Sequence, residues 1–465
     1  MDAKRKQVPF LGALITLIFL IATITVMAVT LGSPPHVPLL IATVFAAVVG
    51  VIFGFRWKDM QEGMVSTIKT AMPSILIIMV VGLLIAMWVA GGVIPAMVYY
   101  GLQIISPRFF LVTALLLCSL VSLALGSSLS TIGTVGVALF GIGEALGIPG
   151  AITAGAIVSG AYFGDKMSPL SDTTNLAPAV AGAGLFDHVR HMLGTTAPTY
   201  AICLVIYGIL GFTMGSGTVD AGQTGQIMAG LKELFVINPL MLLPPLLVIV
   251  MVLFKIPALP GLLAAAFLGL VLAVGFQGAT AASLVSAAMN GFSGESSVAA
   301  VQTLINRGGL MGMMRTVALA LISLSFAGVF ERTGMAASIV EKILKLVHSS
   351  KGLVIATVLT AWIILIATGQ QYVAIIITGR LFKESYDKRN LAPENLSRAL
   401  EDSGTVFGAI VPHSTGAGFT ENALGVSAWQ YGPFTFFGWI NPLVAIARAA
   451  FGRGIKTNPD KAEAK

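Results

Sequence analysis

Two carboxylates, a lysine and a run of hydroxyl groups lie together in one short segment of an otherwise apolar chain. The segment extends from Gly160 to Pro178 and reads Gly-Ala-Tyr-Phe-Gly-Asp-Lys-Met-Ser-Pro-Leu-Ser-Asp-Thr-Thr-Asn-Leu-Ala-Pro. Lipid does not tolerate such a segment, because each unpaired backbone N–H or C=O costs several kcal/mol in hydrocarbon. At membrane depth it must be buried in protein or line a water-filled cavity. It is therefore the first candidate for a functional site.

The oxygen-bearing side chains of this segment predict a sodium site centred on Asp165 and Asp172. Sodium is a hard cation that prefers carboxylate, hydroxyl and carbonyl oxygens. The same carboxylates can bind a proton, since burial favours the neutral acid and a nearby cation favours the ionised form. One site can thus exchange H⁺ for Na⁺ without holding both. The candidate ligands are Asp165, Ser168, Ser171, Asp172, Thr173, Thr174 and Asn175.

Two features of this segment leave alternatives open. A cytoplasmic loop with solvated charges would have a similar composition. Lys166 is either an internal counter-ion or a cation whose long side chain reaches the inner membrane surface.

The second half of the chain offers further polar candidates. Asp402 is its best carboxylate for a cation or proton, whereas Glu401 either joins it or faces a loop with Arg398. Two polar turns and a histidine-containing segment either bind substrate or satisfy loose backbone groups, with a proton relay as another role for the histidine. These residues are Ser127, Ser128, Ser130 and Thr131, then Gln370 and Gln371, and finally His413, Ser414 and Thr415.

Other side chains that can bind metals or react give weaker signals. His188 and His191 have HxxH spacing, but their charged and Gly-Thr-Thr surroundings favour a cytoplasmic turn over a metal site. Cys118 and Cys203 lie in apolar segments without CxxC or Cys/His spacing, so neither disulfide nor zinc chemistry is expected. Further along the chain, Glu421 and Asn422 either line the same cavity as the His413 segment or belong to an outer loop.

Membrane helices must position these residues. The chain has 465 residues, of which 56% are hydrophobic and only 10% charged, with a mean hydropathy of +0.92; soluble domains have about 25% charged residues. Apolar runs long enough to cross about 30 Å of hydrocarbon recur along the whole chain. The sequence therefore predicts an all-α polytopic membrane protein without a soluble domain. The runs include residues 11–31, 37–55, 71–90, 195–213, 236–254 and 259–276.

The start of the chain and the net charge are also typical of a membrane protein. The start, Met-Asp-Ala-Lys-Arg-Lys, is typical of a signal peptide, but the apolar run after it has the length of a span and lacks a convincing cleavage site, so we take it as the first span. The net charge of +7 comes from predicted loops. This distribution indicates the cytoplasmic side of a membrane and not a nucleic-acid partner.

Glycine and proline landmarks indicate that the chain is duplicated. Ser159-Gly160-x-x-Phe163-Gly164 recurs as Ser403-Gly404-x-x-Phe407-Gly408, and Pro38 and Gly92 align with Pro260 and Gly334. The predicted repeats are residues 8–215 and 232–455.

Basic residues predict that the two repeats have opposite orientations. Arg56, Lys58 and Lys69 follow the second span of the first repeat, whereas the matching residues 277–290 contain neither Lys nor Arg. Later loops show the reverse: 135–148 has no basic residue, and its counterpart has five. Under the positive-inside rule, equivalent loops then lie on opposite sides, and both termini are cytoplasmic. We expect a multi-pass protein of the cell (inner or plasma) membrane that works by alternating access.

Five crossings and one hairpin per repeat satisfy this orientation. The first predicted hairpin comprises 109–125, a turn at 126–131 and 132–146; the second comprises 353–367, a turn at 368–371 and 372–382. We favour re-entrant hairpins because both turns are polar but uncharged. The helices that begin near Pro149 and Pro393 are expected to unwind at Ser159 and Gly160 and at Ser403 and Gly404, about 15 Å into the membrane.

Two motifs resemble the NhaC family of sodium/proton antiporters. They are Gly126-Ser-Ser-Leu-Ser-Thr-Ile-Gly-Thr-Val-Gly-Val-Ala-Leu and the stretch from Tyr162 to Pro178. The likeness extends over nearly the whole chain and implies a secondary transporter of the wider ion-transporter superfamily, with Na⁺ and H⁺ as transported ions and no cofactor. Members that couple these ions to malate, lactate or amino acids make a small carboxylate or amino acid the alternative substrate. Arg315 and Arg332 are cations that such a carboxylate would meet.

Other classes of function are disfavoured. There is no GxxxxGK[ST] motif for a primary pump. Phe163-Gly164-Asp165 is similar to an aspartyl protease loop, but Tyr162 replaces the expected glycine and the matching Ala409 supplies no partner carboxylate, so we do not expect an enzyme. A passive channel is left open. The expected partners are Na⁺, H⁺ and the lipid bilayer, with a small carboxylate as the alternative and a homodimer left undecided.

Overall fold

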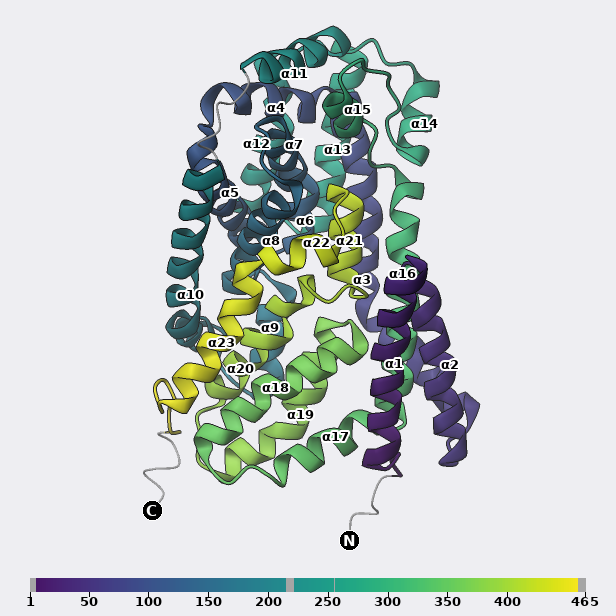
Figure 1. Ribbon diagram of the computed structural model, residues 1–465, viewed down its shortest axis with the longest axis vertical. Helices are drawn as coiled ribbons and strands as arrows, with labels where there is room; N and C mark the ends of the chain where they lie inside the picture. The colour runs from purple at the N-terminus through teal and green to yellow at the C-terminus, as the bar shows by residue number, and fades with distance from the viewer. Residues whose placement is uncertain (1–5, 215–220, 255, 459–465) are drawn as a thin grey trace.

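The computed structural model describes residues 6–214, 221–254 and 256–458, which form a helical protein (Figure 1). Within these ranges, eight helices are long and apolar enough to cross a membrane. The prediction of an all-α polytopic membrane protein is confirmed.

The longer helices are α1 (Phe10–Leu31), α2 (His36–Ile52), α3 (Trp57–Ala90), α4 (Val93–Ile104), α5 (Phe110–Leu125), α7 (Val137–Ala145), α8 (Gly150–Met167), α9 (Asp172–Ala181), α10 (Leu185–Met214), α11 (Ala221–Leu234), α12 (Leu243–Leu253), α13 (Ala258–Phe276), α14 (Ala281–Asn290), α16 (Leu310–Arg332), α17 (Met335–Leu344), α18 (Ser350–Thr368), α19 (Gln371–Lys388), α20 (Pro393–Gly404), α21 (Thr415–Leu424) and α23 (Phe436–Ala450). The shorter ones are η1 (Pro107–Phe109), α6 (Ser128–Thr131), η2 (Ile132–Gly136), η3 (Pro239–Leu242), α15 (Ala299–Ile305), η4 (Val406–Ala409), α22 (Ala428–Tyr431) and η5 (Gly432–Phe434).

The predicted apolar runs correspond to helices. Those at 11–31, 37–55 and 259–276 are α1, α2 and α13, and those at 71–90 and 195–213 lie within the longer α3 and α10. The run at 236–254 differs, because Pro239 opens a short η3 before α12. Thr224–Leu234 and Pro239–Val248 are bent by 97° relative to each other.

Helices α3 and α16 pack against each other through two glycines. A Cβ atom on Gly63 would lie 2.6 Å from the carbonyl oxygen of Gly328, and one on Gly328 would lie 2.6 Å from that of Gly63. Small residues allow such a close approach of membrane helices. On the outside of this pair, α2 packs on α16 and α13 packs on α3.

Both predicted hairpin turns exist, and both are shorter than predicted, with two residues each between the helices. Gly126 follows the last residue of α5 and Gly369 that of α18, and both glycines have left-handed φ angles, 64° and 65°. The second turn is Gly369 and Gln370, since α18 includes Thr368 and α19 begins at Gln371. The first turn is shorter than predicted, because Ser127 caps α6 and places Ser128, Ser130 and Thr131 in a helix.

The predicted unwinding at Ser159 and Gly160 is wrong. Helix α8 continues through both residues to Met167. Gly160 instead allows contact with α5, since a Cβ there would lie 2.9 Å from the Cβ of Cys118. The helix ends where Ser168 precedes Pro169, a position that disfavours helical backbone. In the second half the prediction is confirmed, because α20 ends at Gly404.

Candidate functional site

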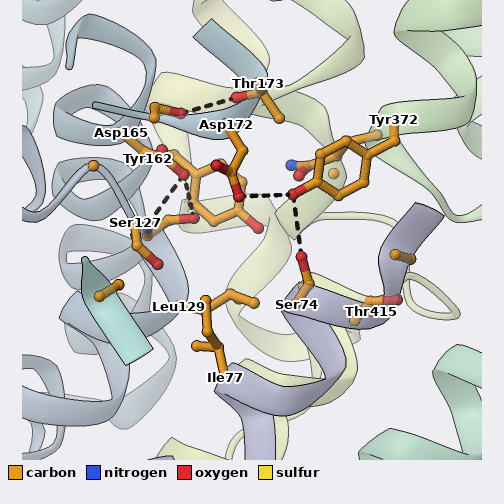
Figure 2. Close-up of a pocket in the computed structure, with 18 of the residues that line it drawn as sticks. Ser74, Ile77, Ser127, Leu129, Tyr162, Asp165, Asp172, Thr173, Tyr372 and Thr415 are labelled. Carbon is orange, nitrogen blue, oxygen red and sulfur yellow. Dashed lines mark hydrogen bonds between the residues drawn. The ribbon is translucent and has the colours of Figure 1, made fainter. Parts of the chain in front are cut away.

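Several helix ends meet at a polar cavity of about 290 Å³. The end of α8, the start of α9 and the α5–α6 turn border it from one half of the sequence. The starts of α19 and α21 border it from the other, and α3 contributes Ser74. Figure 2 shows side chains from these elements pointing toward one another. Helix termini carry unpaired backbone groups and partial charges, so their convergence creates a site suited to ions.

Asp165 is anchored in the last turn of α8. Its Oδ2 atom accepts hydrogen bonds from the backbone N–H of Ser128 at 3.0 Å and from the Ser128 hydroxyl at 2.7 Å. The side chain is nearly buried, with 9% of its surface exposed. Gly126 permits this contact, because a Cβ there would lie 2.6 Å from the backbone of Leu170. The first hairpin is thereby tied to the carboxylate of α8.

Asp172 is the more open carboxylate. It is the first residue of α9, directly after the N-cap Ser171, where the helix dipole favours a negative charge. Its side chain is exposed. The Tyr372 hydroxyl donates to its Oδ2 atom at 3.5 Å and lies 3.1 Å from the Ser74 hydroxyl (Figure 2). Asp172 thus lies where three helices meet, with oxygen lone pairs left for a ligand.

The second hairpin and α21 complete the cavity wall. The Gln370 amide donates to the hydroxyls of Ser323 and Thr415 at 3.1 and 2.8 Å. The Gln371 amide donates to the Thr405 carbonyl at 2.7 Å. These contacts hold the hairpin tip against the broken helix of the second half and leave the amide oxygens available to the cavity.

Comparison with known proteins identifies the family of this chain. The sequence profile described as "Na+/H+ antiporter family" matches residues 160–453, which include both cavity carboxylates and the second hairpin. The chain belongs to this family. The Na⁺/H⁺ antiporter NhaC of Alkalihalophilus pseudofirmus is 38% identical over 97% of both chains. The Bacillus subtilis NhaC is 37% identical, over 96% of this chain and 98% of its own length. The malate-2H⁺/Na⁺-lactate antiporter of Bacillus subtilis is 37% identical over 95% of both chains.

Membership in the Na⁺/H⁺ antiporter family confirms the resemblance stated from the two motifs. Many of the predicted site residues come together in this family member. Those that line the cavity are Ser127, Ser128, Asp165, Ser171, Asp172, Thr173, Gln370, Gln371, Ser414 and Thr415.

Other predicted residues lie outside the cavity wall and hold its backbone. The Thr174 hydroxyl donates to the carbonyls of Asp165 and Lys166, and the Asn175 amide donates to that of Pro169. His413 is buried and contacts the Ile366 carbonyl. Ser168, Ser130 and Thr131 likewise do not line the cavity. Thr174 and Asn175 thereby fix the turn between α8 and α9.

Asp402 lies apart from the cavity in a buried ion pair. Its Oδ1 atom is 2.8 Å from the Lys166 ammonium, and both side chains are fully buried. Thr195 and Asn441 donate to the same oxygen, each at 2.9 Å. Lys166 is therefore an internal counter-ion and does not reach the membrane surface.

The expectation that His188 and His191 lie in a cytoplasmic turn is wrong. They do not form a turn but lie within α10, where both side chains are buried. His188 Nδ1 is 2.8 Å from the Ser397 hydroxyl of α20. Across the described ranges, no group of three or more His, Cys, Asp and Glu side chains could hold a metal ion.

Three polar side chains in the cavity wall were not predicted from the sequence, namely those of Ser74, Tyr162 and Tyr372, and neither were the apolar residues that form the rest of the wall. Tyr372 had a usable signal, because it directly follows the polar hairpin tip. Tyr162 is part of the segment quoted above, one helical turn before Asp165. No sequence pattern pointed to Ser74, since its role depends on α3 packing beside α19. Arg315 and Arg332 do not line this cavity, and Arg332 instead pairs with Glu62 at 3.3 Å.

Proposed function

We propose that this protein exchanges Na⁺ for H⁺ across the cell membrane through the cavity that joins Asp165 and Asp172. The observation that carries the proposal is the placement of two carboxylates, from two helix ends, in one polar cavity. Asp165 has two hydrogen-bond donors from Ser128, whereas Asp172 remains open to a ligand. Such a pair can hold a hard cation and can also be protonated.

The charge balance of the cavity favours exchange. In the described chain, the residues that line it include no Lys or Arg. Two ionised carboxylates without a cationic side chain beside them therefore favour either a bound cation or protons. Na⁺ would be bound by Asp165 and Asp172 with neighbouring hydroxyl oxygens such as those of Ser128 and Thr173. Protonation of the carboxylates removes the charge that holds Na⁺, so the two ions compete for one site.

We further propose two inverted repeats, residues 8–215 and 232–455, with re-entrant hairpins at 109–146 and 353–382. Matching backbone positions support the repeats. Gly126 and Gly369 end the first helices of the hairpins in left-handed conformation, and Gly182 and Gly425 end α9 and α21 in the same way. The reciprocal packing of α2 on α16 and of α13 on α3 fits a pseudo-two-fold relation.

A second polar cavity supports alternating access. It has a volume of about 230 Å³ and lies between the start of α2, α16 and α21. Its lining residues His36 and Thr316 occupy the repeat positions of Ala258 and Ser74, which line the first cavity. At this cavity the Asn422 amide donates a hydrogen bond to the Thr316 hydroxyl at 2.9 Å. We propose that the two cavities are the opposite openings of one route.

Both termini are proposed to be cytoplasmic. The start of α1 and the end of α23 lie toward the same end of the molecule (Figure 1), which supports this part of the proposal. Single cysteines at the exposed positions Lys58 and Lys388 should react from the cytoplasmic side, and those at Gly278 and Gly147 from outside. Labelling of Lys58 and Gly278 from the same side would contradict the inverted repeats.

A small carboxylate is the second candidate substrate. A cavity of about 290 Å³ is several times the volume of one water, about 30 Å³, and therefore exceeds the need of one Na⁺. The glutamines of the second hairpin could bind a carboxylate group, and Arg315 lines the second cavity. The absence of Lys and Arg among the described residues that line the first cavity, where the carboxylates lie, favours plain Na⁺/H⁺ exchange.

Reconstitution in liposomes with an internal pH dye tests the proposal. An imposed Na⁺ gradient should drive protons uphill, which a passive channel cannot do, and Li⁺, K⁺, malate, lactate and amino acids are then added in turn. The double variant Asp165→Asn/Asp172→Asn should lose the signal, whereas Asp59→Asn, at a surface ion pair with Arg56, should keep it. If malate or lactate stimulates the flux, and Gln370→Ala removes that stimulation, the carboxylate exchanger is the correct function.

A further inference from the structure

A second set of charged side chains is buried behind the cavity, around α20. Lys166 pairs with Asp402 at 2.8 Å, and Arg398 Nε lies 3.8 Å from the other oxygen of Asp402. All three side chains are at most 1% exposed. Helix α20 packs against α9, α10, α18, α19 and α23, so these charges lie inside the helix bundle. Ionisable groups in such a position are costly, and at membrane depth they usually have a function.

Glu401 is the unpaired member of this set. Its side chain is fully buried, and neither carboxyl oxygen has a hydrogen-bond partner in the described part of the chain. The Thr405 hydroxyl, one turn later, is close enough to act on the Glu401 carboxyl but makes no well-formed hydrogen bond in the described chain. Burying an ionised carboxylate without donors is strongly unfavourable, whereas the neutral acid is tolerated. The geometry therefore suits a carboxyl group that carries a proton in this conformation.

We propose that Glu401 is a proton-binding site of the exchange cycle, separate from the sodium cavity at Asp165 and Asp172. The proposal rests on the Na⁺/H⁺ exchange proposed above and adds a second carrier to it. Glu401 gains a proton from one side and releases it as H⁺ to the other, and no other bond forms or breaks.

The surrounding charges allow both protonation states of Glu401. The fully buried groups nearby, Lys166, Arg398 and Asp402, sum to one positive charge, so an ionised Glu401 neutralises the set. Burial without donors acts in the opposite direction. The charged groups that act on the Glu401 carboxyl are Lys166 and Asp165 on α8 and Asp402 on α20 itself. The helices packed on α20 carry further charged and titratable groups, which include Asp172 on α9, His188 and His191 on α10, Lys351 at the start of α18, Tyr386 on α19 and Arg448 on α23.

Polar groups connect Glu401 to the cavity. Gln371 lines the cavity and donates to the carbonyl of Thr405, which is one turn from Glu401. Asp165, whose carboxylate lines the cavity, and Lys166 both act electrostatically on the Glu401 carboxyl. A proton on Glu401 is thus sensed by the groups that bind sodium.

Other polar groups lead from this region to the start of α20. His188 contacts Ser397, and the Nε2 atoms of His188 and His191 have no partner in the described chain. Asn395 donates to the Lys456 carbonyl, close to the surface pair of Lys456 and Glu394. These groups lie along α20 between Glu401 and its first turn, so we propose that protons reach Glu401 from this end of the helix.

The test compares Glu401→Gln with Glu384→Gln, the same change at an exposed ion pair with Lys388. Purified protein is assayed for Na⁺-dependent thermal stabilisation, and proteoliposomes for Na⁺-driven proton flux and for the number of H⁺ moved per Na⁺. Glu401→Gln should keep Na⁺ stabilisation but slow proton flux by at least about ten-fold. Glu401→Asp should recover part of the flux, and Glu384→Gln should behave like the unchanged protein.

Infrared difference spectroscopy supplies a readout that a purely structural role would not change. The unchanged protein should show the band of a protonated carboxyl group that is lost in Glu401→Gln and retained in Glu384→Gln. Unaltered flux, H⁺:Na⁺ ratio and carboxyl band in Glu401→Gln would overturn the inference. Failure of the unchanged protein to exchange Na⁺ for H⁺ would instead overturn the proposed function.

Discussion

Asp165 and Lys166 are adjacent on α8, yet they belong to two different electrostatic regions. Asp165 faces the cavity and accepts two hydrogen bonds from Ser128, with no Lys or Arg among the described residues around that cavity. Lys166 faces inward and is paired with Asp402 in this structure. Successive residues of a helix point about 100° apart, so one turn can serve both regions. A carboxylate without a cationic side chain beside it is open to a mobile cation, whereas at a paired carboxylate a mobile cation must compete with the paired side chain.

The largest expected effect is the loss of exchange in the cavity variants. Asp165→Asn and Asp172→Asn keep the side-chain shape but can neither ionise nor hold a cation. Each carboxylate forms a charge pair with the bound Na⁺. Losing one partner of this pair costs about 3 kcal/mol or more, which corresponds to an exchange rate more than about a hundred-fold lower. Na⁺-driven proton release in liposomes measures this loss. Near-normal exchange by both variants would remove the cavity from the mechanism.

Breaking the buried ion pair should instead reduce stability. Lys166→Met leaves Asp402 charged without its main partner, which should lower the free energy of unfolding by about 3–5 kcal/mol. Denaturation in detergent measures this change. The double variant Lys166→Met/Asp402→Asn should recover only part of the loss, because residue 402 is then neutral but the buried Arg398 loses its nearby carboxylate. Equal stability of Lys166→Met and the unchanged protein would contradict the contrast between the two regions.

A smaller effect is expected when Asp165 loses one donor. Ser128→Ala removes the hydroxyl bond of 2.7 Å but keeps the backbone N–H. A hydrogen bond to a charged group contributes about 1.5–3 kcal/mol, so protons should compete better and the apparent Na⁺ affinity should fall about ten-fold. The loss should shrink as the pH rises, because fewer protons then compete. Ser130→Ala, outside the cavity, is the control, and an equal effect there would exclude the Asp165 contact as the cause.

The smallest effect concerns the Tyr372 hydroxyl. Tyr372→Phe removes a long contact with Asp172 and one with Ser74. A weak hydrogen bond of about 0.5–1 kcal/mol predicts a change of about three-fold in apparent Na⁺ affinity. Half-maximal Na⁺ concentrations for proton release provide the measurement. Tyr386→Phe, which removes a buried contact with Thr357 away from the cavity, should leave that concentration unchanged.

The sequence by itself determined the helical membrane architecture and most of the cavity. Apolar runs of span length have one solution in lipid, since helices satisfy their own backbone groups. The polar turns with Gly126 and Gly369 were visible because polar, uncharged residues interrupt apolar segments. Asp165 and Asp172 were visible because carboxylates are rare in such a chain.

The tertiary structure decided which polar residue faces which neighbour. Ser159 and Gly160 suggested a broken helix, but their small size serves packing on α5, and only the folded bundle reveals that partner. Asp402 looked like a cation ligand until α8 placed Lys166 beside it, more than two hundred residues away in the chain. His188 and His191 looked solvated but are covered by α20. Local composition fixes which residues are polar, whereas their partners depend on contacts between distant segments, which one sequence does not encode in any local pattern.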